Sequence, residues 1–401
     1  MLQAGQTENI VYASDFMGKP NINITIDNSP LGQISGKFMH LIRYPHGCAE
    51  QTISTAFPQL YLSEYMKNIA PMMKLNENEL NPNYNVNEAI RKITSLVDNS
   101  GHVSYWPGYS TYNLWLNAYA LHFLSEAEKK GFAVNGSVKE RLIEICNSES
   151  SENKIEKFYT KSESGKSLTK EYIHRDKVYA MYVLASAGTA NKSAMNYSKY
   201  MPSKLMNSSK YLLACSYALS GDLNTYRSIM PSSFIYENNN GNYEYGYYSA
   251  IRDKALVLNA LVESDINNAQ VLTLVKSLSN DLKANYYLNT NELAFSLMAL
   301  GKYSQAMIKP GGKASIIADG KVVGTYNGKL LHLNLKQNFN TLSIKSEGDG
   351  TVYFNCTYEG ISKTGTINSE DKTIKVRREF LNRFGGPITA NTVNQNDLVV
   401  V

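Results

Sequence analysis

Residues 44–54 read Tyr-Pro-His-Gly-Cys-Ala-Glu-Gln-Thr-Ile-Ser and place Cys48 three positions before Gln51 at the expected start of a helix. Residues three apart on a helix lie on the same face about one turn apart, so these two side chains can meet. The Cys48 sulfur can then attack the Gln51 carboxamide, expel ammonia and close a thiolactone, which is a stored acyl group. Pro45 and Gly47 favour a sharp turn into the helix, because proline is barred from helix interiors and glycine adopts unusual backbone angles.

The helix dipole would favour thiolate at Cys48. Taken alone, this cysteine reads more simply as a small buried hydrophobic residue. The wider pattern Tyr-Pro-x-Gly-Cys-x-Glu-Gln-Thr at residues 44–52 resembles the thioester signature of the alpha-2-macroglobulin family, which includes complement thioester proteins and bacterial macroglobulins. Vertebrate members usually carry glycine where Ala49 stands here, so the resemblance points to the bacterial branch.

The resemblance extends over nearly the whole chain. Family-like helical segments follow at residues 112–119 (Tyr-Asn-Leu-Trp-Leu-Asn-Ala-Tyr), 252–258 (Arg-Asp-Lys-Ala-Leu-Val-Leu) and 289–295 (Asn-Thr-Asn-Glu-Leu-Ala-Phe). The resemblance implies that Cys48 and Gln51 form the thioester. It also implies that neighbouring motif residues support the bond, namely Tyr44, Pro45, Gly47 and Glu50.

The length of 401 residues allows two or three domains and a sizeable core. The 40 Lys and Arg nearly balance the 35 Asp and Glu, and no basic cluster indicates a nucleic-acid partner. No apolar run approaches the roughly 18 residues of a membrane span. The four cysteines lack metal-ligand spacing, and an odd set remains once Cys48 is committed. We therefore expect no metal, no cofactor and no disulfide framework.

Hydrophobic periodicity divides the chain into three parts. Residues 7–28 alternate as a strand does, and a helical period follows from about residue 33 to residue 305. After residue 310 the strand period returns, with hairpin signals such as Asp-Gly at 319–320. Several helices are expected to stop at a glycine, which favours the αL conformation beyond a helix end. These glycines are Gly188, Gly221 and Gly301.

Because β sequence flanks the helical block on both sides, residues 7–30 and 311–366 are expected to pair in one β-sandwich. Repeated helix pairs that bury one face must stack or close into a ring. The family resemblance implies closure, which gives a mainly α fold with β: an α/α toroid of six helical hairpins inserted in a CUB-like β-sandwich. The expected limits are 1–30 and 309–368 for the two parts of the sandwich, 31–308 for the toroidal thioester domain, and 369–401 for the start of a truncated macroglobulin-type β domain.

An unshielded thioester would hydrolyse, so aromatic side chains are expected to exclude water from it. Tyr44 is the candidate nearest in sequence, and the others are Trp106, Tyr109 and Tyr245. For each of them the alternative is ordinary aromatic packing at a helix junction. Glu50 also suits the first turn of a helix as an acid favoured by the helix dipole, a role compatible with support of the motif.

The positions of the histidines indicate which nucleophile, an amine or a hydroxyl, the thioester is expected to accept. In complement-like members that favour hydroxyls, a histidine well beyond the cysteine attacks the thioester first. The corresponding stretch here, Glu-Lys-Phe-Tyr-Thr at 156–160, has no histidine, and His174 comes later. The resemblance therefore implies direct transfer to amines, which are better nucleophiles than alcohols without a general base. His46 faces away from Cys48 at a helical spacing of two, and His102, His122 and His174 are expected at core edges or helix caps.

The resemblance implies the thioester segment of a bacterial broad-spectrum protease inhibitor, which is a single-use covalent trap and not an enzyme. Its expected partners are target proteases, bound covalently through lysine amines, and the remaining domains of the parent macroglobulin. Family members act outside the cytoplasm, so we expect a periplasmic or cell-surface location within a larger exported protein. The first residues of the chain lack the charged and apolar regions of a signal peptide.

Two other classes of function remain as alternatives. A carbohydrate-active enzyme with an α/α toroid would need paired acidic residues or a His or Tyr base in a central cleft, and the sequence shows no such pair. A hydrolase built on Cys48 would need a downstream histidine at a defensible position, and none stands out.

Overall fold

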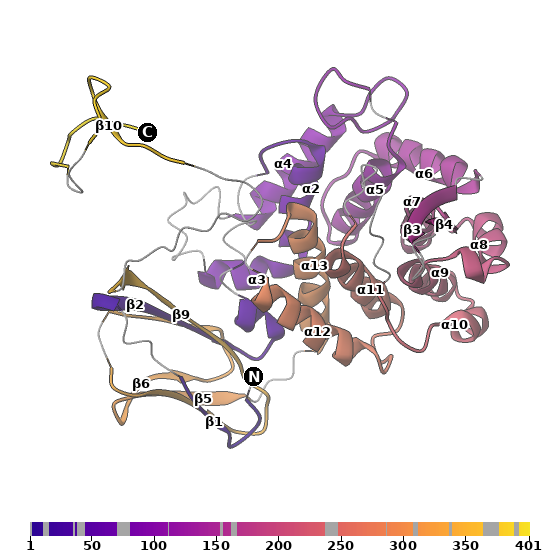
Figure 1. Ribbon diagram of the computed structural model, residues 1–401. Coiled ribbons are helices and arrows are strands. Elements are labelled where there is room, and N and C mark those ends of the chain that lie inside the picture. Colours follow the sequence, from indigo (N-terminus) through magenta and orange to yellow (C-terminus); the bar gives the residue numbers. More distant parts are fainter. Residues whose placement is uncertain are drawn as a thin grey trace. The chain divides into compact units, whose positions relative to one another are not determined.

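The computed structural model of the chain (Figure 1) describes residues 2–10, 16–34, 37, 45–69, 81–110, 112–152, 155–161, 167–236, 248–285, 287–307, 312–336, 339–363, 377–388 and 393–401. The chain divides into two compact units. The first comprises Met1–Tyr12 and Asn21–Glu359, and the second comprises Ala13–Pro20 and Gly360–Val401. No helix among the described residues is both long and apolar enough to cross a membrane.

The first unit contains a closed ring of helices (Figure 1). In the described part of the chain, the ring is lined by α2 (Ala49–Ala56), α5 (Leu114–Lys129), α7 (Arg175–Ser186), α9 (Asn207–Leu219), α11 (Ala250–Ser264) and α13 (Thr290–Met307). Each of these helices packs on the next, and α13 packs on α2, which closes the ring. Beyond Phe57 and Pro58, α2 continues as α3 (Gln59–Ile69), which also contacts α13. The predicted α/α toroid is confirmed.

A second layer of helices covers this ring: α4 (Pro82–Ser95), α6 (Gly136–Ser151), α8 (Lys192–Lys199), α10 (Leu223–Ile229) and α12 (Val271–Ala284). The two layers differ in sequence. The inner helix α5 is buried from Leu114 to Ala127, because other helices contact it on several sides. The outer helix α12 buries a single stripe with the spacing of one helix face. That stripe consists of Val271, Leu274, Val275, Leu278 and Leu282.

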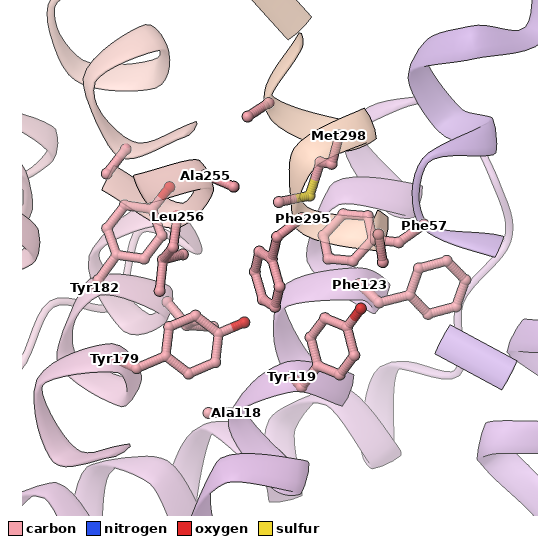
Figure 2. Packing of buried hydrophobic residues seen from close by; sticks show 14 of the residues in the cluster. Phe57, Ala118, Tyr119, Phe123, Tyr179, Tyr182, Ala255, Leu256, Phe295 and Met298 are labelled. Atoms are coloured by element: carbon pink, nitrogen blue, oxygen red, sulfur yellow. The ribbon is translucent and has the colours of Figure 1, made fainter. Parts of the chain in front are cut away.

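Aromatic side chains fill the interior of the ring (Figure 2). The rings of Tyr119 and Phe295 stack with their centroids 5.2 Å apart, and Phe57 meets Phe123 edge-on at 5.6 Å. Tyr179 of α7 approaches Phe295 edge-on from the opposite side. Both arrangements suit the charge distribution of aromatic rings. The tyrosine-rich centre of the toroid is therefore a packed core.

The helical block differs from the sequence prediction in two places. Residues within it form a β-hairpin of β3 (Ile155–Lys161) and β4 (Ser167–Ile173), where β-branched and aromatic residues favour strands over helix. Gly301, expected to end a helix, lies inside α13, where a Cβ would lie 3.0 Å from side chains of Tyr61 and Leu62. This glycine permits close packing of α13 on α3. Gly188 and Gly221 follow helix ends with positive φ, as predicted.

Two β-sheets enclose a separate core. One sheet has the order β1 (Thr7–Asn9), β8 (Leu342–Glu347), β5 (Lys313–Ala318), β6 (Lys321–Tyr326), and the other has β7 (Leu331–Leu335), β2 (Phe16–Asp27), β9 (Tyr353–Ser362). Ile24 pairs with Leu333, so strands from both ends of the helical block share a sheet. Their core includes Ile24, Ile316 and Ile344. The expected pairing across the helical block is confirmed, whereas the domain limits and the CUB-like assignment stay predictions.

Short elements lie before the helical ring and in the C-terminal segment. The 3-10 helix η1 (Pro30–Ile34) follows β2 and packs on α12 and α13. In the second unit, β10 (Leu381–Asn382) pairs with β11 (Val399–Val400). The region expected to begin a macroglobulin-type β domain starts at residue 369, and its first residues, to 376, lie outside the described residues. That domain stays a prediction.

Candidate functional site

Cys48 is the N-cap residue of α2, as the sequence pattern predicts. Its backbone is extended, with φ −72° and ψ 176°, and the preceding Gly47 has φ +96°, a conformation that favours glycine. A Cβ at Gly47 would lie 2.1 Å from Gln51 Oε1, so the glycine also leaves the space that the glutamine side chain occupies. Pro45 is buried at the start of this turn. The Pro-x-Gly spacing thus builds the turn that presents Cys48.

The Gln51 side chain folds back onto Cys48. The Cys48 backbone N–H donates to Gln51 Oε1 at 3.1 Å, and the Cys48 side chain faces the Gln51 backbone N–H in the manner of a capping box. The hydrogen bond to Oε1 polarises the carboxamide and would stabilise negative charge on that oxygen during attack at the carbonyl carbon. Cys48 is partly exposed and Gln51 is exposed, so a nucleophile can reach the pair.

Glu50 anchors the first turn of α2 to α13. Its buried carboxylate, 2% exposed, accepts hydrogen bonds from Ser54 Oγ at 2.6 Å and from Thr290 Oγ1 at 3.0 Å, with Asn291 Nδ2 at 3.5 Å. Ser54 Oγ also lies 3.1 Å from Tyr119 Oη, and burial together with the charge of Glu50 raises the pKa of Tyr119. Glu50 therefore holds the first turn of α2 against α13, a position that also suits the helix dipole, and its support of a thioester stays a prediction.

Lys92 of α4 is a neighbour of the site that sequence reasoning missed. Its ammonium donates to the Gly47 carbonyl at 2.7 Å and to the Pro45 carbonyl at 3.4 Å. Burial lowers the pKa of Lys92, and negative charge on Cys48 opposes that shift. No local motif could have indicated this residue, because the packing of α4 on α2 brings it to the site.

The aromatic residues expected to shield the thioester fall into two groups. Trp106 and Tyr109 belong to the loop that begins at Tyr105, whose carbonyl accepts from the Ala49 N–H at 3.0 Å. The loop is thus attached to the first residue of α2, but the side chains of Trp106 and Tyr109 are 51% and 71% exposed. Shielding by these two residues stays a prediction. The other two candidates, Tyr44 and Tyr245, lie outside the described residues.

Three histidines outside the motif, His102, His122 and His174, lie in the core or at a helix cap. His174 caps α7, where its Nδ1 accepts from the Asp176 N–H at 3.3 Å and its Nε2 lies 3.5 Å from Glu156 Oε1. His102 Nδ1 lies 2.9 Å from Asn117 Nδ2 in the core. His122 is fully buried, and its Nδ1 lies 3.0 Å from Tyr179 Oη. The exposed His46 lies beside the Cys48 turn on the N-terminal side.

A group of ionisable residues inside the ring is hydrogen-bonded and ion-paired within the protein. His122, Glu126 and Glu263 lie close enough together to suggest a metal site. However, the buried ammonium of Lys302 pairs with Glu126 at 2.9 Å and also with Glu263. Tyr61 and Tyr182 donate to the same two carboxylates. The two carboxylates thus belong to an ion cluster with Lys302, Tyr61 and Tyr182.

The chain is similar to known proteins over nearly its whole length. Residues 22–153 match the family of the A-macroglobulin TED domain. An alpha-2-macroglobulin of Xylella fastidiosa is 23% identical over 406 residues, which cover 95% of this chain. In this domain and along most of its length, the chain is similar to the alpha-2-macroglobulin family. It spans 23% of the length of that relative.

Solved alpha-2-macroglobulin structures share the fold. Native Escherichia coli alpha-2-macroglobulin, from domain MG7 to the C-terminus, matches with a TM-score of 0.69 at 20% identity, over 99% of this chain and 62% of that one. Salmonella alpha-2-macroglobulin reacted with methylamine matches with a TM-score of 0.67 at 18% identity, over 99% of this chain and 26% of that one. The toroid and the β-sandwich described here therefore belong to an architecture already seen among macroglobulins.

Proposed function

We propose that this chain is the thioester-bearing segment of a bacterial macroglobulin-like protease inhibitor, in which Cys48 and Gln51 form a thioester that acylates amines of a trapped protease. The observation that carries the proposal is the Gln51 side chain folded onto Cys48, with Oε1 at 3.1 Å from the Cys48 nitrogen. The alpha-2-macroglobulin relationship supports it, because members of this family are protease inhibitors.

The chemistry uses the two motif residues once. Attack of Cys48 Sγ on the Gln51 carbonyl carbon forms the C–S bond, breaks the C–N bond and releases ammonia. Later, an amine attacks the same carbon, the C–S bond breaks, and its electron pair returns to sulfur, which takes up the proton that the amine loses. The product is a substituted amide at Gln51 and a free Cys48 thiol. The carbonyl ends as a stable amide, so the site is a single-use trap and not an enzyme.

Amines are the nucleophiles that this site favours. His174 caps α7 and lies between the acidic side chains of Glu156 and Asp176, an arrangement that supports a structural role. Without an acyl-carrier histidine, a neutral amine attacks far faster than an alcohol or water. Capture would then go through lysine amines of the protease. The Salmonella relative whose structure was solved after reaction with methylamine is consistent with this preference.

The segment would act within a larger exported protein. Its partners are the other domains of a parent macroglobulin and the captured protease. The natural location is extracytoplasmic, in the periplasm or at the cell surface. Trp106 and Tyr109, attached to α2 through the Tyr105 carbonyl, are the described aromatic residues that would help to exclude water from the thioester.

The ring interior does not favour a carbohydrate-active enzyme. Such an enzyme needs two carboxyl groups free to act as acid and base or nucleophile across a sugar. Here Glu126 and Glu263 lie inside the ring but are held by Lys302. Stacked aromatic side chains fill the adjoining space (Figure 2).

Competition between methylamine and glycerol at neutral pH tests the proposed reaction. Peptide mass mapping of the wild-type chain would show a methylamide at Gln51 with little glycerol ester, and His174→Ala would give the same ratio. Cys356→Ala, at the other partly exposed cysteine, is the matched control and should react as the wild type does. Predominant ester formation that disappears in His174→Ala would contradict amine preference, and no product at Gln51 would contradict the thioester itself.

A further inference from the structure

Lys92 holds the turn that leads to Cys48. It lies in the last turn of α4, and its ammonium binds the carbonyl oxygens of Gly47 and Pro45 at 2.7 and 3.4 Å. Those two residues, with His46 between them, make up the turn immediately before the cysteine. In the described part of the chain, no carboxylate forms an ion pair with Lys92. The turn carbonyls thus bind the ammonium without neutralising its charge.

A positive charge at this position favours one step of the thioester reaction. When an amine attacks the Gln51 carbonyl, the bond to Cys48 Sγ breaks and the sulfur leaves with negative charge. Cys48 lies next to Gly47, whose carbonyl is 2.7 Å from the Lys92 ammonium. The N-terminal end of α2 contributes only a partial positive charge. Its first amide, Ala49 N–H, is already bonded to the Tyr105 carbonyl.

We propose that Lys92 is a positioning residue for thioester cleavage: it fixes the Pro45–Gly47 turn and its charge stabilises the departing Cys48 thiolate. This inference rests on the proposed function, since it assigns a role in the reaction of Cys48 and Gln51. Lys92 itself forms and breaks no covalent bond. The proton lost by the attacking amine goes to the sulfur or to solvent.

Three substitutions separate the charge of Lys92 from its hydrogen bonds. Lys92→Arg keeps both, Lys92→Gln keeps an N–H donor without charge, and Lys92→Met loses both. Arg91→Gln, which removes an exposed positive charge one residue away on α4, is the matched control. The rate at which methylamine cleaves the thioester is measured by intact mass, at low and at high salt, for the wild type and for each variant. We expect Lys92→Gln and Lys92→Met to react about tenfold more slowly at low salt, the effect of one nearby charge.

Lys92→Arg should stay within about threefold of the wild-type rate, and the difference between wild type and Lys92→Gln should shrink at high salt, because salt screens charge. Arg91→Gln should behave as the wild type does. Wild-type rates in Lys92→Gln would overturn the proposal. If Lys92→Arg and Lys92→Gln lost the same fraction of the cleavage rate at every salt concentration, Lys92 would have a steric role, and the proposed role of its charge would be overturned.

A second measurement tests whether Lys92 stabilises the Cys48 thiolate even if no thioester forms. In the Gln51→Ala background, Cys48 stays a free thiol, and iodoacetamide alkylation at neutral pH can be read at the Cys48 peptide. Adding Lys92→Gln should slow this alkylation several-fold at low salt, because less thiolate is stabilised. Unchanged alkylation would contradict the role of Lys92. A wild-type chain that never carries the thioester would instead contradict the proposed function and leave this result to decide the role of Lys92.

Discussion

Glu50 and Thr290 join the first and last inner helices of the ring: both carboxylate oxygens of Glu50 lie 3.0 Å from Thr290 Oγ1. Glu50 precedes Gln51 directly, whereas Thr290 begins α13. The closure of the toroid and the position of Gln51 therefore depend on the same buried carboxylate. A disturbance of this contact should affect both stability and the thioester.

Replacement of Glu50 by Gln should destabilise the fold and shorten the lifetime of the thioester. The change weakens charge-assisted hydrogen bonds to Ser54 and Thr290 in a buried setting, at a cost of about 1.5–3 kcal/mol. Urea unfolding measures the free energy of unfolding, and the loss of methylamine reactivity with time measures the lifetime of the thioester. Glu144→Gln removes an exposed ion pair with Arg141 and should cost no more than about 1 kcal/mol. Equal effects of the two substitutions would contradict an anchoring role for Glu50.

Replacement of Gly47 by Ala should prevent thioester formation while the rest of the chain folds. The new Cβ would meet Gln51 Oε1 at 2.1 Å and Gln51 Cδ at 2.9 Å, and the residue has φ +96°. Gly108→Ala is the control, because Gly108 has φ +79° and no atom within 4 Å of the added Cβ. Intact mass and circular dichroism check both variants. A methylamine-reactive Gly47→Ala chain would show that the turn is less restrictive than its geometry indicates.

His122 should make stability fall on mild acidification. Burial, with the nearby charge of Lys302, lowers the pKa of His122 to about 3, so the folded state takes up its proton later than the unfolded state does. Its contribution is fully present above about pH 6.5 and declines as the pH falls toward 3, by up to about 1.4 kcal/mol per unit. Urea unfolding at several pH values between 6.5 and 5 gives the free energy of unfolding as a function of pH. This free energy should fall less steeply with pH in His122→Gln than in the wild type or in His46→Gln. Identical slopes would contradict a neutral buried His122.

The sequence predicted that Cys48 and Gln51 lie side by side because that pair is local. Cys48 and Gln51 share one helical turn, so residue spacing alone brings them together. The helical block and the paired β segments follow from a change of hydrophobic period along the chain, whereas closure of the helices into a toroid was implied by the family resemblance. Lys92 and Thr290 reach the site through helix packing, which no local pattern encodes. Gly301 was misread for the same reason, since a close contact with α3, and not a helix end, requires it.

The intact mass of the freshly purified chain shows whether Cys48 and Gln51 form a thioester. A thioester between Cys48 and Gln51 makes the wild type about 17 Da lighter than its sequence mass, because ammonia has left. Methylamine should then add to Gln51 and release one thiol at Cys48, whereas Cys48→Ala should have its full sequence mass and take up no methylamine. A wild-type chain of full sequence mass, with an unmodified Gln51 amide and a freely alkylated Cys48, would contradict the proposed thioester.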